Sequence, residues 1–215
     1  MAQANTQTSQ AARKRSIGKH QVDERRESIL AEAEQLFLVQ GLEATSMIDI
    51  AQSAGISKVT LYRYFPDKNP IAFEIAARML DRITIRCGVH DRTLSDAERI
   101  QASLINMIRR FDELREAYRY IGLFDHLYAS SYPSQQLADW YKERIERAGR
   151  QLFAGELDIA PAIHHSVVTL INVIMSFLEK MAARGELMGD EQGVDLRLQL
   201  AAFERFITKL IEEIE

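Results

Sequence analysis

Residues 55–68, GISKVTLYRYFPDK, hold the side chains of this chain best suited to binding a large anion. The stretch carries Lys58, Arg63 and Lys68, with Tyr62 and Tyr64 between them, and no acidic residue before position 67. Lysine and tyrosine side chains donate hydrogen bonds to phosphates, and arginine can donate twice to guanine in a duplex. The pattern predicts a surface that lies against nucleic acid, although by itself it also fits a solvated helix face.

Two short helices must position this surface. Ser46 can cap the first helix, and Asp49, three residues later, completes a capping box. Gly55 can adopt the positive φ that a tight turn needs. Ser57 can cap the second helix, which we expect over about residues 58–65.

The packing between these two helices is also specified by the sequence. Helices that cross at a steep angle need a small residue at the crossing point, and Ala51 provides it. Apolar residues must close the wedge between the helices, and they are present at Ile50, Ala54, Ile56 and Leu61. These features together predict a helix-turn-helix motif over residues 46–65.

A longer helix is predicted before this motif, over about residues 23–40. Its apolar residues fall on one face with helical spacing, at Ile29, Ala33, Leu36 and Phe37. Gly41 follows the last apolar turn, where a left-handed cap ends many helices. The predicted DNA-binding domain therefore spans residues 23–68.

Residues 1–22 have a different composition. They are rich in Gln, Ala, Ser and Thr without apolar periodicity, so we expect a disordered tail. The tail carries four cations and no acid, whereas the net charge of the whole chain is −4. Such a tail either keeps the protein soluble or contacts phosphates and the minor groove as a basic arm.

The span from Arg26 to about Ile75 resembles the DNA-binding domain of the tetracycline-repressor (TetR) family. The residues that carry the resemblance are Ile29, Leu30, Ala33, Leu36 and Phe37, then Gly41, Thr45 and Ser46, then Ile50, Ala51 and Ala54 to Ser57, and finally Thr60 to Tyr62, Tyr64, Phe65 and Lys68. The resemblance covers about a quarter of the chain. It implies a homodimeric, all-helical regulator whose C-terminal domain binds a small molecule and thereby releases DNA.

The same resemblance implies roles for individual residues. The DNA-facing positions are Ser46, Met47 and Ile48 at the start of the first short helix, Lys58, Val59 and Thr60 near base edges, and Tyr62, Tyr64 and Lys68 on phosphates. Arg63 can reach a base, a phosphate or only water. The sequence departs from the family pattern at Asn69 and Pro70, where members usually continue with acidic residues and a leucine.

The rest of the chain, residues 69–215, predicts long helices and no strand. We expect helices over about residues 68–86, 95–114, 116–129, 134–153, 160–184 and 190–215, which gives an all-α fold of about nine helices. The last two have more apolar surface than one monomer core needs, which suggests a partner helix pair across a twofold axis. The predicted dimer-interface residues are Ile163, Val167, Leu170, Ile174, Leu196, Leu200, Phe203 and Ile207.

An effector pocket is expected among the middle helices. Its candidate lining residues are Met107, Phe111, Tyr118, Phe124, His126, Tyr128, Trp140, Tyr141 and Met175, although apolar residues at helical spacing are also typical of a plain core. A metal site is not expected, because adjacent residues such as His164 and His165 point about 100° apart on a helix. No other cofactor is indicated.

Other features limit the cellular context. Cys87 is the only cysteine, which excludes an internal disulfide framework and favours a reducing, cytoplasmic setting. The N-terminus is polar, so no secretory signal is expected. Residues 159–178 are uncharged and long enough to span a bilayer, but their polar residues indicate a helix buried in protein.

Three functions remain open at this point. The first is a repressor that is released from a pseudo-palindromic operator by a small, largely apolar effector. The second is an architectural or division-linked DNA binder of the same fold without such a ligand. The third is a helical enzyme, which is disfavoured because the sequence has no Glu-x-x-His pair, nucleophile elbow, phosphate loop or zinc signature.

Overall fold

The structure is a computed structural model that describes residues 2–131, 135–153, 161–187 and 196–212. Side chains are described in these ranges except at residues 2–19, 127–131, 135–138, 141, 145–146, 161–164 and 185–187.

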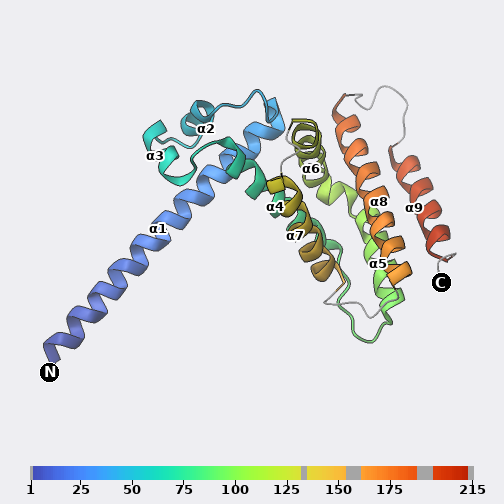
Figure 1. Cartoon of the computed structure of the whole chain (residues 1–215), viewed down its shortest axis with the longest axis horizontal. Coiled ribbons are helices and arrows are strands. Elements are labelled where there is room, and N and C mark those ends of the chain that lie inside the picture. Colours follow the sequence, from blue (N-terminus) through green and yellow to red (C-terminus); the bar gives the residue numbers. More distant parts are fainter. Residues whose placement is uncertain (1, 132–134, 154–160, 188–195, 213–215) are drawn as a thin grey trace. The chain divides into compact units, whose positions relative to one another are not determined.

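All regular structure in the described ranges is helical (Figure 1). The helices are α1 (Ala2–Gln40), α2 (Met47–Ser53), α3 (Lys58–Tyr64), α4 (Lys68–Cys87), α5 (Asp96–Arg109), α6 (Phe111–Ser131), α7 (Gln135–Leu152), α8 (Pro161–Leu187) and α9 (Leu196–Glu212). The predicted all-α fold of about nine helices is confirmed.

The chain forms two compact units that divide inside α4, between Ile75 and Ala76. This division lies later than the predicted boundary at residue 68, because Ile71 and Ala72 in the first turns of α4 are completely buried. In the first unit, α1 packs on α2 and α2 packs on α3. The apolar core of this unit is formed by Ile29, Leu30, Ala33, Phe37, Ile50, Ala51, Leu61, Phe65, Ile71, Ala72 and Ile75.

The N-terminus differs from the prediction. We expected a disordered tail and a helix from about Asp23, whereas α1 is continuous from Ala2 to Gln40. The segment contains no proline and is rich in Ala, Gln, Arg and Lys, which are good helix formers. Because extending a formed helix is far easier than nucleating one, the helix that starts in the packed part of α1 can propagate into these residues.

The second unit is built around α6 and α8, which pack along each other, while α5 packs on both α8 and α9. Gly122 permits the close approach of α6 to α8, since a Cβ atom there would lie 3.2 Å from the Cβ of Glu179. The buried stripe of α8 consists of Val167, Leu170, Ile174, Leu178 and Met181. This packing is that of a core helix of the second unit.

One stretch of α8, His165–Arg184, is long and apolar enough to cross a membrane, and a third of it is buried in the fold. Length and composition are weak indicators of a span, because core helices meet the same criteria. The buried stripe of α8 supports the interpretation of a helix packed in protein.

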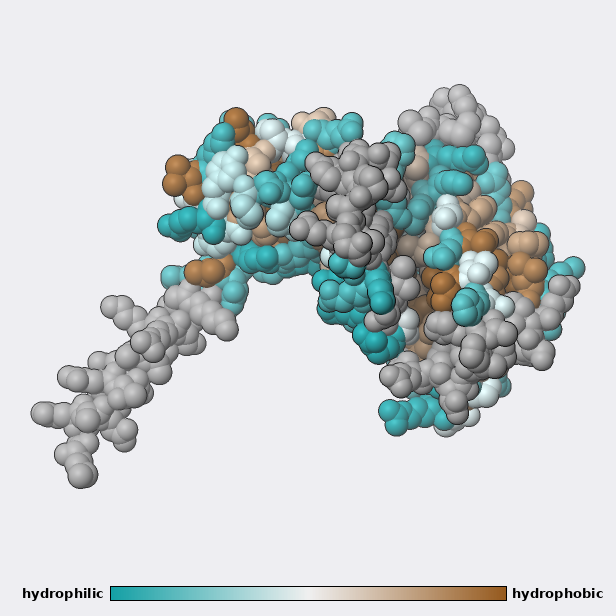
Figure 2. All heavy atoms as spheres, viewed as in Figure 1, coloured by the Kyte–Doolittle hydropathy of each residue, from teal (hydrophilic) through white to brown (hydrophobic). Residues whose placement is uncertain are grey.

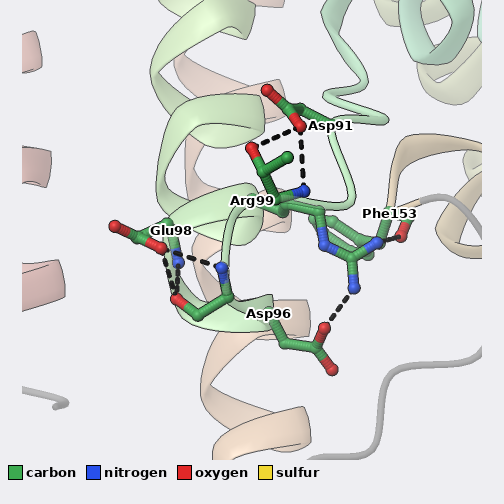
Figure 3. A network of polar contacts seen from close by, with 7 residues as sticks. Asp91, Asp96, Glu98, Arg99 and Phe153 are labelled. Atoms are coloured by element: carbon green, nitrogen blue, oxygen red, sulfur yellow. Dashed lines mark hydrogen bonds and ion pairs between the residues drawn. The ribbon is translucent and has the colours of Figure 1, made fainter.

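The connection from α4 to α5 is held by local hydrogen bonds (Figure 3). Asp91 Oδ1 accepts bonds from the backbone N–H of Thr93 at 2.9 Å and from its hydroxyl at 2.7 Å. Ser95 then caps α5, and Glu98 completes the capping box by accepting from the Ser95 backbone N–H at 2.8 Å. The predicted cap at Ser95 is confirmed.

The start of α5 is also tied to the end of α7. Arg99 forms an ion pair with Asp96 and donates to the backbone carbonyl of Phe153 at 3.2 Å (Figure 3). The Ser103 hydroxyl donates to the carbonyl of Leu152 at 3.2 Å and accepts from the backbone N–H of Val89 at 3.0 Å. These bonds join the ends of α4 and α7 to the side of α5.

Two predicted helix boundaries were wrong. We expected the helix after Ser95 to continue to Leu114 and the next to begin near Glu116, but α5 ends at Arg109 and α6 begins at Phe111. The chain redirects at Arg110, whose φ of −94° and ψ of 17° interrupt the helix without glycine or proline. Such a break leaves little trace in composition. The second wrong boundary is the end of α8, which continues through Gly185 to Leu187, whereas we expected the helix to end near Arg184.

Candidate nucleic-acid interface

The start of α2 is fixed by a reciprocal cap. The Ser46 hydroxyl accepts from the Asp49 backbone N–H at 3.2 Å, and the Asp49 carboxylate accepts from the Ser46 N–H at 2.8 Å. Hydrogen bonds from the Ser46 side chain and backbone hold the pKa of Asp49 below its usual value. The predicted capping box is confirmed, and it presents Ile48 at the surface with an exposed fraction of 49%.

The turn between α2 and α3 follows the prediction as well. Gly55 has a φ of 62°, in the left-handed region that glycine adopts without steric cost. The N–H of Ile56 returns to the carbonyl of Ala51 at 2.9 Å, which closes the turn. Ser57 then caps α3 by accepting from the Thr60 N–H at 3.1 Å.

The two faces of α3 have opposite environments. Leu61 is completely buried and Phe65, at the C-cap, is 1% exposed, so this side fixes α3 to the domain. On the outer side, Val59 is 77% exposed and Tyr62 is 44% exposed. The exposed cations Lys58 and Arg63 lie on the same helix. A short helix with an apolar anchor and a cationic, aromatic outer side has the form of a helix that enters the major groove.

Lys58 and Tyr62 also contact each other. The Lys58 Nζ lies 5.7 Å from the centroid of the Tyr62 ring, within the range of a cation–π interaction. The pair is one turn apart on α3, so the ring can steady the lysine stem while the ammonium stays in water. An ammonium presented in this way is available to a phosphate.

Three other predicted DNA-facing residues are half-buried. The Thr60 hydroxyl lies 2.9 Å from that of Ser57, so it takes part in the cap of α3. Tyr64 lies beside the first helix, in a shallow open depression whose other lining residues are Gln21, Val22, Glu24, Arg25 and Ser28 of α1. Met47 is the third. Of the predicted DNA-facing residues in the motif, those that are exposed are Ser46, Ile48, Lys58, Val59, Tyr62 and Arg63.

Lys68, for which the resemblance implies a phosphate contact, is bonded within its own unit in this structure. Its ammonium donates to the backbone carbonyl of Leu42, and also to those of Glu43 at 3.2 Å and Thr45 at 2.9 Å. The ammonium is thus engaged by the loop between α1 and α2. Sequence spacing placed Lys68 at the rim of the DNA-binding surface but carried no information about these carbonyls.

The sequence analysis missed Arg26. Its guanidinium lies 4.7 Å from the centroid of the Phe65 ring and forms an ion pair with Glu74. One residue of α1 thereby contacts both the end of α3 and the first turns of α4. Arg26 precedes the buried Ile29 by three positions. This helical spacing could have indicated that Arg26 lies on the packed side of α1.

The residues proposed to line an effector pocket are placed differently from one another. Met107, Phe111, Tyr118 and Phe124 are at most 2% exposed, and the Tyr118 hydroxyl donates to the Met107 carbonyl at 3.0 Å. The rings of Phe124 and Trp140 are 5.2 Å apart, and Trp140 and Met175 are half-buried. His126 is exposed. The side chains of Tyr128 and Tyr141 lie outside the described residues.

The predicted dimer residues also differ from one another in burial. Val167, Leu170, Ile174 and Ile207 are at most 7% exposed within a single chain, so they belong to its own core. Leu196, Leu200 and Phe203 are half-buried, and the side chain of Ile163 lies outside the described residues. Among the side chains that the structure describes, the large apolar residues that α8 and α9 expose are Val173, Leu198 and Phe206, at 43%, 68% and 54%. Figure 2 shows brown, hydrophobic surface on the side of this unit where Figure 1 places α8 and α9.

A family model and several curated proteins match part of this chain. The family model for bacterial regulatory proteins of the tetR family matches residues 29–75. The HTH-type transcriptional activator FasR of Mycolicibacterium smegmatis is 30% identical over 106 residues, which cover 49% of this chain and 48% of FasR. The HTH-type transcriptional repressor KstR2 of Mycobacterium tuberculosis is 37% identical over 82 residues, which cover 38% of this chain and 41% of KstR2. The matches span about half the length of these relatives or less.

Solved structures resemble this chain over most of its length. A putative TetR-family transcriptional regulator from Rhodococcus sp. has a TM-score of 0.57 at 19% identity, over 86% of this chain and 99% of that one. A TetR-family transcription regulator from Marinobacter aquaeolei VT8 also has a TM-score of 0.57 at 19% identity, over 91% and 97%. At such identities the likeness establishes the fold alone. Residues 29–75 thus match the model of the bacterial tetR family of regulatory proteins, and the described helices share the fold of these solved structures.

Proposed function

We propose that this protein is a sequence-specific DNA-binding transcription regulator. The observation that carries the proposal is the outer side of α3, where Lys58, Val59, Tyr62 and Arg63 are exposed around an anchor of buried Leu61. Cations suit the phosphates, arginine can donate to guanine, and an exposed valine can contact a thymine methyl group. The protein would act in the cytoplasm of a bacterium, where it meets chromosomal DNA.

The proposed regulator is a homodimer on a pseudo-palindromic operator. A twofold dimer places two recognition helices on successive turns of the major groove, about 34 Å apart. The exposed apolar residues Val173, Leu198 and Phe206 on α8 and α9 suit a four-helix interface between two copies. This revised set replaces the buried residues that the sequence analysis assigned to the interface.

We further propose that the regulator represses transcription and that a small, largely apolar effector bound in the second unit releases it from DNA. The relatives include both a named activator and a named repressor, so the direction of regulation is a proposal for this chain. The aromatic character of the middle helices supports an apolar effector, with Trp140 and Met175 as half-buried candidates for its contacts.

A second candidate is a DNA binder of the same fold without a small ligand. It is favoured by one observation: Met107, Phe111, Tyr118 and Phe124 are packed as closed core. No reaction is proposed for the chain. In the portion that the structure describes, no three His, Cys, Asp or Glu side chains gather closely enough to hold a metal ion.

The experiment that tests the main proposal is selection of binding sites from random duplex DNA, followed by fluorescence anisotropy with the selected sequence. We expect a pseudo-palindromic site that binds at least a thousandfold more tightly than bulk DNA at physiological salt. Equal affinity for selected and random duplexes would refute a specific regulator. Screening small apolar compounds for release of the bound duplex then separates the ligand-responsive candidate from the ligand-free one.

A further inference from the structure

The ammonium of Lys68 makes a complete set of bonds inside the DNA-binding unit. Its three acceptors are the backbone carbonyls of Leu42, Glu43 and Thr45. All three belong to the loop between the end of α1 and the start of α2. An ammonium has three N–H donors and no acceptor. The three carbonyls of this loop therefore use the full donor capacity of the Lys68 ammonium.

The loop needs such a donor. It leaves α1 at Gly41, whose φ of 90° turns the chain, and it enters α2 at the Ser46 cap. Leu42 and Thr45 are 3% and 1% exposed, so two of the three accepting carbonyls belong to buried residues, while Glu43 between them is exposed. Buried carbonyls without a partner are costly. A cation is also favoured beside the C-terminal end of α1, where the helix dipole is negative.

Hydrogen bonds within the loop add to this arrangement. The Thr45 hydroxyl donates to the Gly41 carbonyl at 2.7 Å and accepts from the Gln40 side chain at 3.1 Å. Thr45 directly precedes the Ser46 cap, so a loop held at Thr45 also fixes the first residue of α2. Lys68 connects this loop to another element of the unit, the start of α4.

The placement of Lys68 at the start of α4 is itself specified. Asp67 accepts from the Asn69 backbone N–H at 2.8 Å and so caps the helix that carries the lysine. Burial lowers the pKa of Lys68, while the Glu43 carboxylate partly opposes that effect. The side chain is half-buried, unlike Lys58 on the outer side of α3. A phosphate could recruit the Lys68 ammonium only by displacing one of its carbonyl partners.

We propose that Lys68 is a positioning residue for DNA binding: it fixes the α1–α2 loop, and with it the start of α2, by donating to three backbone carbonyls, and it does not bind phosphate. The proposal deepens the proposed function and rests on it. It predicts that Lys68 affects affinity through the geometry of α2, whereas Lys58 affects affinity through its charge.

Three variants of the chain distinguish these roles: Lys68→Met, Lys68→Arg and Lys58→Met. Methionine keeps much of the apolar stem and removes the donors. Arginine keeps the charge and binds phosphate well, but its planar fork cannot direct three donors at the converging carbonyls. Each variant is studied by thermal unfolding, by amide hydrogen exchange of residues 41–48, and by anisotropy with the selected duplex over a salt series.

For a positioning role, both Lys68 variants lower the thermal midpoint by about 3–6 °C and speed amide exchange in the loop. At temperatures where the protein stays folded, both weaken operator binding about tenfold with an unchanged slope of log affinity against log salt. The Lys58→Met variant keeps the midpoint and reduces that slope by about 0.9, the value for one lost phosphate contact. The buried-core variant Ile83→Val in the second unit lowers the midpoint without changing the affinity of the folded protein.

The proposal is overturned if Lys68→Arg binds as tightly as the natural protein and melts at the same temperature, or if Lys68→Met reduces the salt slope by about one contact. A fall in the midpoint with unaltered operator affinity would also overturn it, because Lys68 would then be structural only. The thermal and exchange measurements need no DNA. If the natural protein binds no operator, the proposed function fails while these measurements still report on the loop.

Discussion

The guanidinium of Arg26 lies over the ring of Phe65, 4.7 Å from its centroid. Phe65 is the C-cap residue of α3 and is almost completely buried, so this contact joins α1 to the end of the helix proposed to enter the groove. Arg26 also pairs with Glu74 in α4. The orientation of α3 in its unit therefore depends on a side chain that lies outside the helix-turn-helix motif.

Replacing Arg26 by alanine removes the contacts with Phe65 and Glu74 together. Because the arginine is only partly exposed, we expect a loss of about 1–2 kcal/mol in the free energy of unfolding, measured by chemical denaturation. We also expect weaker operator binding by the folded protein, since the end of α3 is less well held. Arg82→Ala, at an exposed position of α4, is the matched control and should leave both quantities unchanged. Identical behaviour of the two variants would contradict a specific role for Arg26.

Much of this unit could be predicted from the sequence because its local rules agree with one another. The Ser46–Asp49 capping box and the positive φ values of Gly41 and Gly55 follow from residue type and position alone. The bonds of Lys68 could not be predicted in this way. They join residues more than twenty positions apart, and their acceptors are backbone carbonyls, which every residue possesses.

The second unit shows another limit of sequence patterns. Helical periodicity correctly grouped Val167, Leu170 and Ile174 on one face of α8. Periodicity does not say what covers that face, and these residues are buried by helices of their own chain. The exposed Leu198 and Phe206 differ from the buried residues of α9 only in their direction around the helix, which becomes assignable once α5 is placed against α9.

Val59 should determine part of the sequence preference. It is 77% exposed at the start of α3, and its two methyl groups are suited to contact a thymine methyl in the major groove. Val59→Ala should therefore reduce discrimination at one base pair of each half-site by about 1 kcal/mol without changing the salt slope. Repeating the selection from random DNA with the variant measures this effect.

Val39→Ala is the control for Val59. Val39 is 81% exposed at the end of α1, so the substitution removes the same methyl groups from a surface outside the motif. The control should keep the natural preference. If the Val59 variant selects the same operator with the same discrimination at every position, Val59 takes no part in readout.

The exposed apolar residues of α9 should control dimer formation. Introducing a charge by Phe206→Glu or Leu198→Glu would place an unpaired carboxylate in the proposed interface, which is strongly unfavourable. We expect both variants to be monomers when their molar mass is measured by light scattering, with operator affinity reduced by at least tenfold because the two half-sites are no longer bound together. Ile85→Glu, at a 62% exposed position on α4, is the matched control and should remain dimeric. Dissociation by Ile85→Glu but not by the α9 variants would place the interface on another face.

Glu179 should make the stability of the second unit depend on pH. Burial, and then the nearby Asp125 carboxylate, raise the pKa of Glu179 to about 8 from 4.5, while Lys180 opposes the shift. The folded state therefore favours the protonated carboxyl group. The resulting stability is fully present below pH 4.5 and is lost as the pH rises through about 8. Glu179→Gln stays neutral throughout, so its stability should lack this loss.

The measurement is the free energy of unfolding in urea at several pH values between 4 and about 9, for the natural chain and for Glu179→Gln. All other titrating groups are common to both proteins, so the difference between the two curves isolates Glu179. That difference should grow in favour of the glutamine variant as the pH rises through the window. Glu116→Gln, at an exposed position of α6, should give a curve parallel to that of the natural protein. If the curve of Glu179→Gln is also parallel to that of the natural protein, the prediction is wrong. The Glu179 carboxylate would then ionise in the folded protein as easily as in the unfolded one, despite the close approach of α6 and α8 at Gly122.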